Sequence, residues 1–400
     1  MAIPEVTPAY TSKLRIEAIQ TVIPSKVAGP GLRRRISVSG PLRSDIYRKH
    51  IHIVLCYKKT HEDECGWMVA GWLKESMNSV LSEYPAFAGR LRRGSHGDDR
   101  ELAIVFNDSG IRLVQAQMDM TLSEFLNSSE REDSEAELAF WKDVDEENPQ
   151  YSALFYVQDV ESGETAPMRG LIPSWMAHMS EIKAVQRVTN FQGDGYSIGI
   201  TSSVLLADPI LMTSFIRRWA HIHDEILAQN TIPKIPLFYL PNFKKTDRAS
   251  TTPLTSTPCN HNHYQTMTFK LPNMDSKRFM EANETCEAIA SLCSEEAVRI
   301  LGGNETFSKL SFIFNDRSGD WRVITCVEEG QIGYKGRHEG AMGPTSWDDL
   351  GANEVSFYKG NMPVHVAYHV ESCHDEGLVL IMPPIEEGSL GIAVSVTVPK

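Results

Sequence analysis

Residues 188–210 read VTNFQGDGYSIGITSSVLLADPI, and this stretch decides how the chain around it is interpreted. Small and β-branched residues from Tyr196 to Val204 are typical of a buried strand. A helical apolar period then follows over Ile210–Leu227. Asp208 and Pro209 interrupt the apolar run between the two, so Tyr196–Phe215 predicts a strand followed by a helix and not a membrane span.

Short apolar runs of the same kind recur along the whole chain, and one clear helical period lies over Trp67–Tyr84. Strands mixed with helices in irregular order predict the α/β class, with mixed sheets. The other runs that we expect to form strands are Leu14–Val22, His52–Tyr57, Leu102–Phe106, Leu154–Gln158, Thr266–Leu271, Phe307–Phe314, Arg322–Cys326, Val364–Val370, Leu378–Met382 and Ile392–Val398.

The length of 400 residues predicts two lobes, because a single core seldom serves more than roughly 250–300 residues. Residues 234–262 are rich in Pro, Ser and Thr, which is typical of a linker. We therefore expect an N-terminal lobe over 1–233, a crossover over 234–262 and a shortened C-terminal lobe over 263–400. Within the first lobe, 159–187 is interpreted as an insertion, because its removal would join Val157-Gln158 directly to Val188-Thr189.

The composition is that of a soluble globular protein, with 42% hydrophobic and 23% charged residues. A net charge of -13 argues against a nucleic-acid binder, which needs clustered positive charge. Two basic runs, Arg33–Arg35 and Arg90 with Arg92-Arg93, could hold a phosphate. Such a run is more often a solvated face.

Seven widely spaced cysteines without a CxxC pair indicate reduced thiols. Because the sequence starts without a signal or transit pattern, we expect a cytoplasmic protein with no transmembrane segment. We expect no metal site: His221 and His223 do not share a helix face, and Cys259, His261 and His263 are too few and wrongly spaced. His365 and His369 share a strand face and could supply a replacement base, although histidines on a sheet face more often have an ordinary packing role.

Four segments, taken in order, resemble the BAHD superfamily of plant acyl-CoA-dependent acyltransferases. Leu81–Leu91 (LSEYPAFAGRL) resembles the family's LxxYPxxAGRL, and Asn107–Ile111 resembles its CNDxGv strand exit. Val188–Ile200 resembles VTxFxCGGxxiGi, and Phe215 with Trp219-Ala220 falls where the family has F…WA. The resemblance implies a two-lobed, chloramphenicol-acetyltransferase-like fold with an inter-lobe channel and Val204 near its centre.

The family's HxxxD motif should follow Ile200, and here it is degenerate. Aligned on Asp208, the histidine position holds Val204, which cannot take a proton from the attacking hydroxyl or amine. By resemblance, Asp208 is structural and pairs with an arginine. Ser202 has the parity of Val204 and could face the same cavity, but a lone serine without a base is a poor nucleophile.

The second family signature, DFGWG, is also eroded. Its best counterpart is Asp349-Leu350-Gly351-Ala352-Asn353, in which only Asp349 and Gly351 match. By resemblance this loop supports the channel and lies away from the chemistry. We expect no tightly bound cofactor, and a coenzyme A thioester as the co-substrate if the chain transfers acyl groups.

Three functions stay open from the sequence. The first is acyl transfer from an acyl-CoA to an alcohol or amine, weakened or lost with the histidine, in a monomer of plant secondary metabolism. The second is a non-catalytic partner of fatty-acid elongase components, as in the eceriferum-like proteins of wax synthesis, associated with the endoplasmic reticulum. The third is a lyase reaction in the same cleft.

Overall fold

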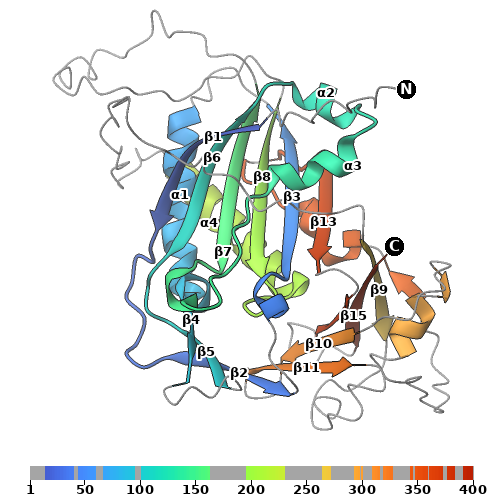
Figure 1. Ribbon diagram of the computed structural model, residues 1–400. Coiled ribbons are helices and arrows are strands. Elements are labelled where there is room, and N and C mark those ends of the chain that lie inside the picture. The colour runs from blue at the N-terminus through green and yellow to red at the C-terminus, as the bar shows by residue number, and fades with distance from the viewer. Residues whose placement is uncertain are drawn as a thin grey trace, which may run out of the picture.

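The computed structural model describes most of the chain, and all structural statements below concern that part (Figure 1). The described residues are 14–39, 44–59, 66–94, 101–162, 195–229, 264–271, 292–297, 299–300, 309–315, 319–327, 343–345, 347–358, 360–372, 376–382 and 391–399. The predicted linker at 234–262 lies outside them. So do residues 163–187 of the predicted insertion.

The first sheet, called sheet A, has six strands and forms the upper layer in Figure 1. Its β6 and β7 are parallel, whereas its other neighbouring strands are antiparallel. In spatial order the strands are β1 (Leu14–Val22), β6 (Ile111–Met118), β7 (Phe155–Ser162), β8 (Gly195–Ser203), β3 (His50–Lys58) and β13 (His365–Glu371).

The second sheet, called sheet B, has nine strands and lies below sheet A in the same view. It is also mixed, because β10 pairs with β14 and β11 with β2 in parallel. Its order is β12 (Gly343–Thr345), β9 (Tyr264–Leu271), β15 (Ile392–Pro399), β14 (Glu376–Met382), β10 (Lys309–Asn315), β11 (Trp321–Val327), β2 (Arg33–Ser39), β5 (Glu101–Val105) and β4 (Arg90–Arg93).

The two sheets exchange strands across the predicted lobe boundary. β13, from the C-terminal part of the chain, closes one edge of sheet A, and β2, β5 and β4, from the N-terminal part, extend sheet B. The mixed α/β class expected from the sequence is confirmed. The division into lobes at 234–262 remains a proposal about the chain, and each sheet uses strands from both sides of that boundary.

Helices cover both faces of sheet A. The long helices α1 (Gly66–Glu83) and α4 (Pro209–Ala228) pack together on one face, and α2 (Leu122–Leu126), α3 (Arg131–Ser134) and the 3-10 helix η3 (Glu135–Leu138) lie on the other. The remaining short 3-10 helices are η1 (Ser44–Tyr47), η2 (Pro85–Ala88), η4 (Pro149–Tyr151), η7 (Trp347–Leu350) and η8 (Ala352–Glu354).

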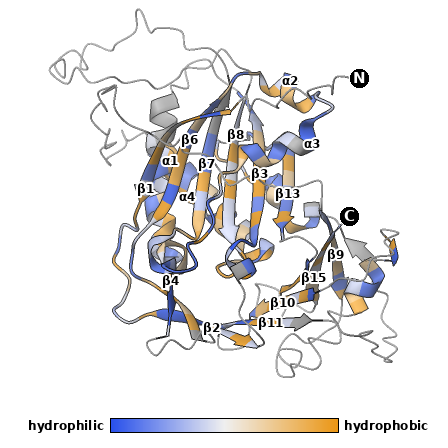
Figure 2. Ribbon diagram, viewed as in Figure 1, coloured by the Kyte–Doolittle hydropathy of each residue, from blue (hydrophilic) through white to orange (hydrophobic). Residues whose placement is uncertain are grey.

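One main core joins the two sheets. It contains Ile53 of sheet A, Phe215 and Trp219 of α4, and Ile313 and Leu380 of sheet B, all buried. Figure 2 shows the hydrophobic colour along the strands of both sheets. Because burial of apolar surface is the dominant favourable contribution to folding, the sheets stabilise each other.

The structure contains strands that the apolar pattern did not predict. β2 begins with three arginines, and its side chains alternate between solvent and core from Arg33 to Ser39. β6 and the short β4 were also missed. The predicted insertion begins inside β7, which continues to Ser162 with Asp159 opposite Ile198 of β8.

Gly199 of β8 lets η3 approach the sheet closely. A Cβ atom at Gly199 would lie 1.9 Å from the carbonyl oxygen of Leu138, which is backbone and cannot swing aside. We expect Gly199→Ala to lower the free energy of unfolding by about 1–3 kcal/mol in urea denaturation. Gly29→Ala is the control, because its Cβ would meet only the flexible Leu32 side chain. Equal stability of Gly199→Ala and the parent chain would contradict this close contact.

Candidate functional site

Val204 follows directly after the last residue of β8 and is fully buried. Its side chain belongs to the main core, as do those of Leu205, Leu206 and Ala207. The backbone N–H of Val204 donates to the carbonyl oxygen of Lys49 at 3.2 Å, which fixes the end of β8 against the start of β3. The position expected near the centre of a channel is therefore filled by an aliphatic side chain without exposed surface.

Asp208 ends the loop after Val204 and begins α4. Its Oδ1 accepts the backbone N–H of Leu211 at 2.8 Å, so the carboxylate is the N-cap of the helix. Burial raises the pKa of Asp208 to about 6, although the N–H groups of Leu211 and Ile210 and the charge of Arg34 oppose this rise. Arg34 Nη1 also donates to the carbonyl of Leu206 at 2.9 Å. The carboxylate thus caps the helix, and its structural role stays a prediction.

Ser202 is fully buried on β8, opposite Ile51 of β3 and Phe155 of β7. Its hydroxyl donates to the carbonyl oxygen of Ser203 at 3.1 Å. A serine nucleophile needs a base within hydrogen-bond reach, whereas this hydroxyl donates to the backbone. The arrangement therefore fits a packing role for Ser202.

A buried ion cluster lies between the two sheets beside Val204. Lys49 Nζ is 2.9 Å from Glu376 Oε2 of β14 and donates to Ser311 Oγ of β10 at 3.0 Å. Lys309 Nζ contacts the other oxygen of Glu376 at 3.0 Å. Burial alone would raise the pKa of Glu376, but the two ammonium groups outweigh it and hold this pKa below its usual value.

The cluster lines a small cavity that is partly open to solvent. Val38 and Ile46 supply apolar walls, and Thr325 adds a hydroxyl. Sequence reasoning missed this cluster because its members are far apart in the chain and form no motif. A lysine directly before a buried strand was the only available signal.

The histidines of sheet A lie on its other face. His365 Nε2 and His369 Nε2 lie 2.7 Å and 3.1 Å from the two oxygens of Glu135, and His52 Nδ1 lies 2.7 Å from Thr201 Oγ1. His50 stacks on Trp141 with ring centroids 4.5 Å apart. By strand alternation this is the face covered by α2, α3 and η3, whereas Val204 packs in the core on the α1 and α4 side.

His365 and His369 thus share a face, as their spacing predicts, but they are bound to Glu135 and not placed near Val204. Their partner Glu135 is far away in the sequence and had no signal of its own. Burial alone would raise the pKa of Glu135, but hydrogen bonds and charge from the two histidines lower it to about 2. Arg131 Nε adds a contact at 3.2 Å.

The counterpart of the DFGWG motif packs against α4. Gly351 has φ +83°, a conformation that favours glycine, and a Cβ there would lie 3.3 Å from the guanidinium of Arg217. Arg217 in turn pairs with Glu354 at 2.5 Å. Asp349 is exposed in η7. This loop contacts the same helix that Asp208 caps and lies apart from Val204.

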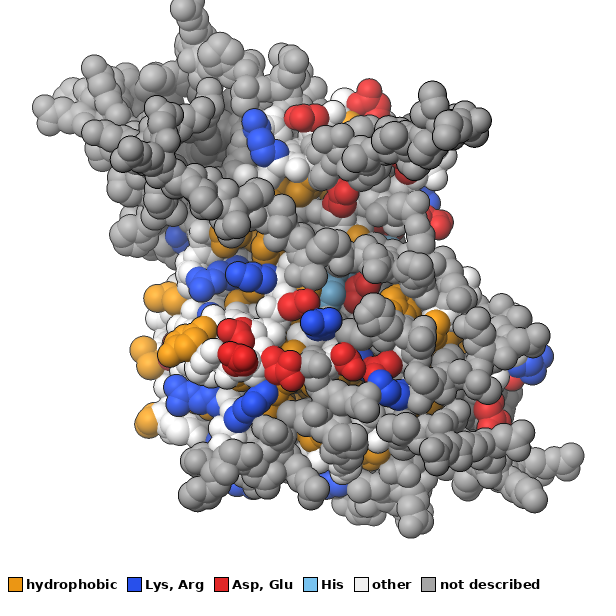
Figure 3. All heavy atoms as spheres, in the orientation of Figure 1, with side chains coloured by type: hydrophobic (Ala, Val, Ile, Leu, Met, Phe, Trp, Pro, Cys, Tyr) orange, Lys and Arg blue, Asp and Glu red, His pale blue; other side chains and the backbone are white. Residues whose placement is uncertain are grey.

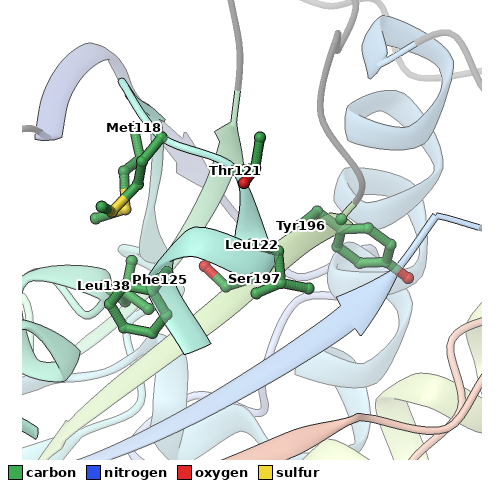
Figure 4. Close-up of a pocket in the computed structure, with 9 residues that line it drawn as sticks. Met118, Thr121, Leu122, Phe125, Leu138, Tyr196 and Ser197 are labelled. Carbon is green, nitrogen blue, oxygen red and sulfur yellow. The ribbon is translucent and has the colours of Figure 1, made fainter. Parts of the chain in front are cut away.

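A second small cavity lies beneath α2 near the start of β8 and is drawn in Figure 4. Its lining is mainly apolar, with Met118, Leu122, Phe125 and Leu138 around it. Gly195 and Tyr196 of β8 also line it, so it lies at the opposite end of that strand from Val204. Few polar side chains line this cavity, so it lacks groups that could take part in catalysis.

The two described histidine candidates of α4, His221 and His223, each have another partner. His223 is buried and lies 3.1 Å from Ser76 Oγ, and burial lowers its pKa to about 4, while His221 pairs with Glu225 on the exposed side of α4. Cys259, His261 and His263 lie outside the described residues. Among those described, no group of three or more His, Cys, Asp or Glu side chains is arranged to hold a metal ion.

None of the helices in the described ranges is long and apolar enough to cross a membrane.

Glu135→Gln is expected to destabilise the protein at neutral pH and not at very low pH. The folded-state pKa of about 2 lies below the ordinary 4.5, so the stabilisation is fully present above about pH 4.5 and is lost as the pH falls through 2. We expect a cost on the order of 2–3 kcal/mol at about pH 7, measured by urea denaturation across pH. Exposed Glu132→Gln is the matched control. A constant penalty at every pH would contradict the ionic role of Glu135.

Comparison with known proteins places these observations in a family. The model of the Transferase family matches residues 20–237, which is more than half of the chain. Rosmarinate synthase from Plectranthus scutellarioides is 23% identical over 182 residues. That alignment covers 46% of this chain and 34% of the relative, so only about a third of the relative's length is matched.

Solved structures with a related arrangement include vinorine synthase, with a TM-score of 0.45 and 13% identity over 97% of this chain and 95% of that one. Another is TRI101 of F. sporotrichioides complexed with coenzyme A and T-2, with a TM-score of 0.41 and 10% identity over 89% and 93% of the two chains. The family match rests on residues 20–237, which include the β8 stretch, Val204 and Asp208. The chain belongs to the Transferase family, the BAHD acyltransferase superfamily.

Proposed function

We propose that this chain is a BAHD-family protein in which transfer from an acyl-CoA to an alcohol or amine is weak or absent, because Val204 stands where the family has its general base. The observation that carries the proposal is the complete burial of Val204. Loss of a positioned base typically costs about 10²–10⁴ in rate. An aliphatic side chain without exposed surface cannot bind a substrate or exchange a proton.

The neighbouring groups are poor substitutes for the missing base. The imidazoles of His50, His52, His365 and His369 lie on the opposite face of sheet A. Glu376 is paired with two lysines that lower its pKa, which weakens it as a base. Asp208 has a pKa of about 6, near the useful range, but its carboxylate is directed at the N-terminus of α4. Each candidate is thus excluded by its position or by its partner.

The other two functions use the same fold. A non-catalytic partner of very-long-chain fatty-acid elongase components, soluble but associated with the endoplasmic reticulum, is favoured by the sealed Val204 position. A lyase reaction would need an acid or base at the cavity, where Lys49 and Glu376 are the ionisable pair. Co-purification with condensing enzymes would support the role as an elongase partner. Lyase turnover that is lost in Lys49→Met would support the lyase reaction.

We expect the unmodified chain to release coenzyme A from an acyl-CoA at the rate of the uncatalysed mixture. If release is faster, we expect its rate to be at least about 10²-fold below that of family transferases. The measurement is thiol release from a panel of acyl-CoAs with alcohols and amines. Saturable ester or amide formation that survives Val204→Ala unchanged would contradict the proposal. Survival of that activity in Ser202→Ala would also exclude Ser202 as a substitute nucleophile.

The Val204→His variant tests whether the site lacks only its base or is also closed to substrates. The imidazole is larger and more polar than the valine that it replaces, so we expect a loss of about 1–3 kcal/mol in the free energy of unfolding and little gain in transfer. Val204→Phe is the matched control, because it adds bulk without a base. A gain of about 10² or more in Val204→His but not in Val204→Phe would show an intact acyl-CoA site that lacks only its base.

A further inference from the structure

Three arginines from the two basic runs meet on one face of sheet B. Arg33 and Arg35 lie on β2, Arg92 lies on β4, and both strands pair with β5. Arg35 and Arg92 are both opposite Ala103 in the register of β5. Since residues directly opposite each other project to the same side, and i and i+2 share a side, all three face the same way. All three are exposed.

The side chains of Arg33, Arg35 and Arg92 differ from those of the other described arginines in their partners. Arg34 and Arg93 alternate with them in the same two runs, and each donates to a backbone carbonyl. Arg90 shares the side of Arg92 but is buried and donates to the carbonyls of Gly89 and Gly110. The other described arginines that hold a partner are Arg15, Arg48, Arg112, Arg131, Arg217, Arg218, Arg299 and Arg322. Within the described ranges, no ion pair or hydrogen bond involves the side chains of Arg33, Arg35 or Arg92, although the backbone N–H of Arg35 donates to Asp320 Oδ1 at 2.9 Å.

The three charges are widely spaced on one face of the sheet. Strands lie about 4.8 Å apart, so the Cα atoms of Arg35 and Arg92, two strands apart, are separated by roughly 10 Å. Half-buried Ala103 and Val105 form the surface between the arginines. Neither cavity described above includes these residues. Widely separated cations on a sheet face fit an extended anionic surface better than a small ligand, which is usually held by groups that converge on it.

Exposed apolar side chains lie in the connection that leads into β2. Val27 is 88% exposed, Ile23 54% and Leu32 47%, and Leu32 directly precedes Arg33. The connection is held in place by bonds from Ala28 N to Asp108 Oδ2 and from Phe106 N to the Leu32 carbonyl. Figure 3 shows apolar side chains together with Lys or Arg side chains along the edge of the molecule that this connection forms in Figure 1.

We propose that Arg33, Arg35 and Arg92, with the exposed apolar residues of the β1–β2 connection, form a docking surface for a bilayer that carries anionic lipids. Arginines attract the headgroups, and exposed Val27 and Leu32 can enter the interfacial layer. The net charge of -13 does not prevent this, because charges beyond a Debye length of about 8–10 Å are largely screened. The inference is independent of whether acyl transfer survives.

The test is co-sedimentation of the full chain with vesicles of phosphatidylcholine alone or of phosphatidylcholine mixed with phosphatidylserine. We expect binding only to the mixed vesicles, and we expect it to weaken as salt is added. Each arginine should contribute about fivefold, so Arg33→Gln, Arg35→Gln and Arg92→Gln combined should lower the partition coefficient roughly 100-fold. The matched control is Arg218→Gln with Arg299→Gln, two exposed arginines that have acidic partners.

Thermal unfolding of the triple variant shows whether the fold is retained, and we expect equal or higher stability because exposed like charges are removed. Absence of binding to the mixed vesicles, or equal binding by the triple variant, would overturn the proposal. Polyglutamate serves as a second probe: binding to it without binding to vesicles would mean that the surface takes an acidic polypeptide, and the bilayer proposal would fail.

The apolar part of the surface has its own variant. Val27→Asp places a negative charge at the most exposed apolar position and should lower vesicle binding at least as much as the loss of one arginine. Met362→Asp is the control, because Met362 is also 50% exposed and lies outside this connection. Equal effects of the two changes would limit the docking surface to its arginines and would contradict the apolar contribution.

Discussion

The buried ion pair between Lys49 and Glu376 is the contact on which the arrangement of the two sheets depends. Lys49 directly precedes β3 of sheet A, and Glu376 begins β14 in the middle of sheet B. Both side chains are almost fully buried, so neither charge can be left alone. Breaking such a pair from one side typically costs about 3–5 kcal/mol, because the remaining charge stays buried without a partner. Since the Lys49 carbonyl also binds Val204 N–H, the same residue fixes the end of β8.

The buried polar groups near Val204 serve the scaffold. The groups around the degenerate motif are engaged in folding: Asp208 caps α4, Arg34 holds the Leu206 carbonyl, and Ser202 donates to the backbone. Each contact satisfies a buried polar group, whose desolvation would otherwise be costly. Selection for stability alone is sufficient to keep such contacts. Their presence therefore says that the fold is maintained and says nothing in favour of catalysis.

Sequence reasoning located the strand–loop–helix unit well, because Tyr196–Val204 and Asp208-Pro209 carry strong local signals for a buried strand and a helix start. It missed β2, because three arginines hide the alternation of Ile36 and Val38 into the core. It could not place Glu135 beneath His365 and His369, or Glu376 beside Lys49. The first contact depends on the packing of η3 against β13, and the second on the packing of the two sheets, and local periodicity encodes neither. The family resemblance supplied the fold class that local patterns left open.

The two basic runs, Arg33–Arg35 and Arg90 with Arg92-Arg93, contain arginines in two kinds of environment, which the register of the strands reveals. Alternate residues in β2 and β4 project to opposite sides, so Arg34 and Arg93 are bound to carbonyls while Arg33, Arg35 and Arg92 remain in solvent. Arg90 lies on the same side as Arg92, but it is buried and donates to the carbonyls of Gly89 and Gly110. The bound arginines hold the chain around Val204 and the neighbouring turns. Among the described residues, the side chains of Arg33, Arg35 and Arg92 have no hydrogen bond or ion pair, so folding alone gives no reason for their placement. The buried Val204 and the exposed arginines together favour a protein that acts through binding at its surface.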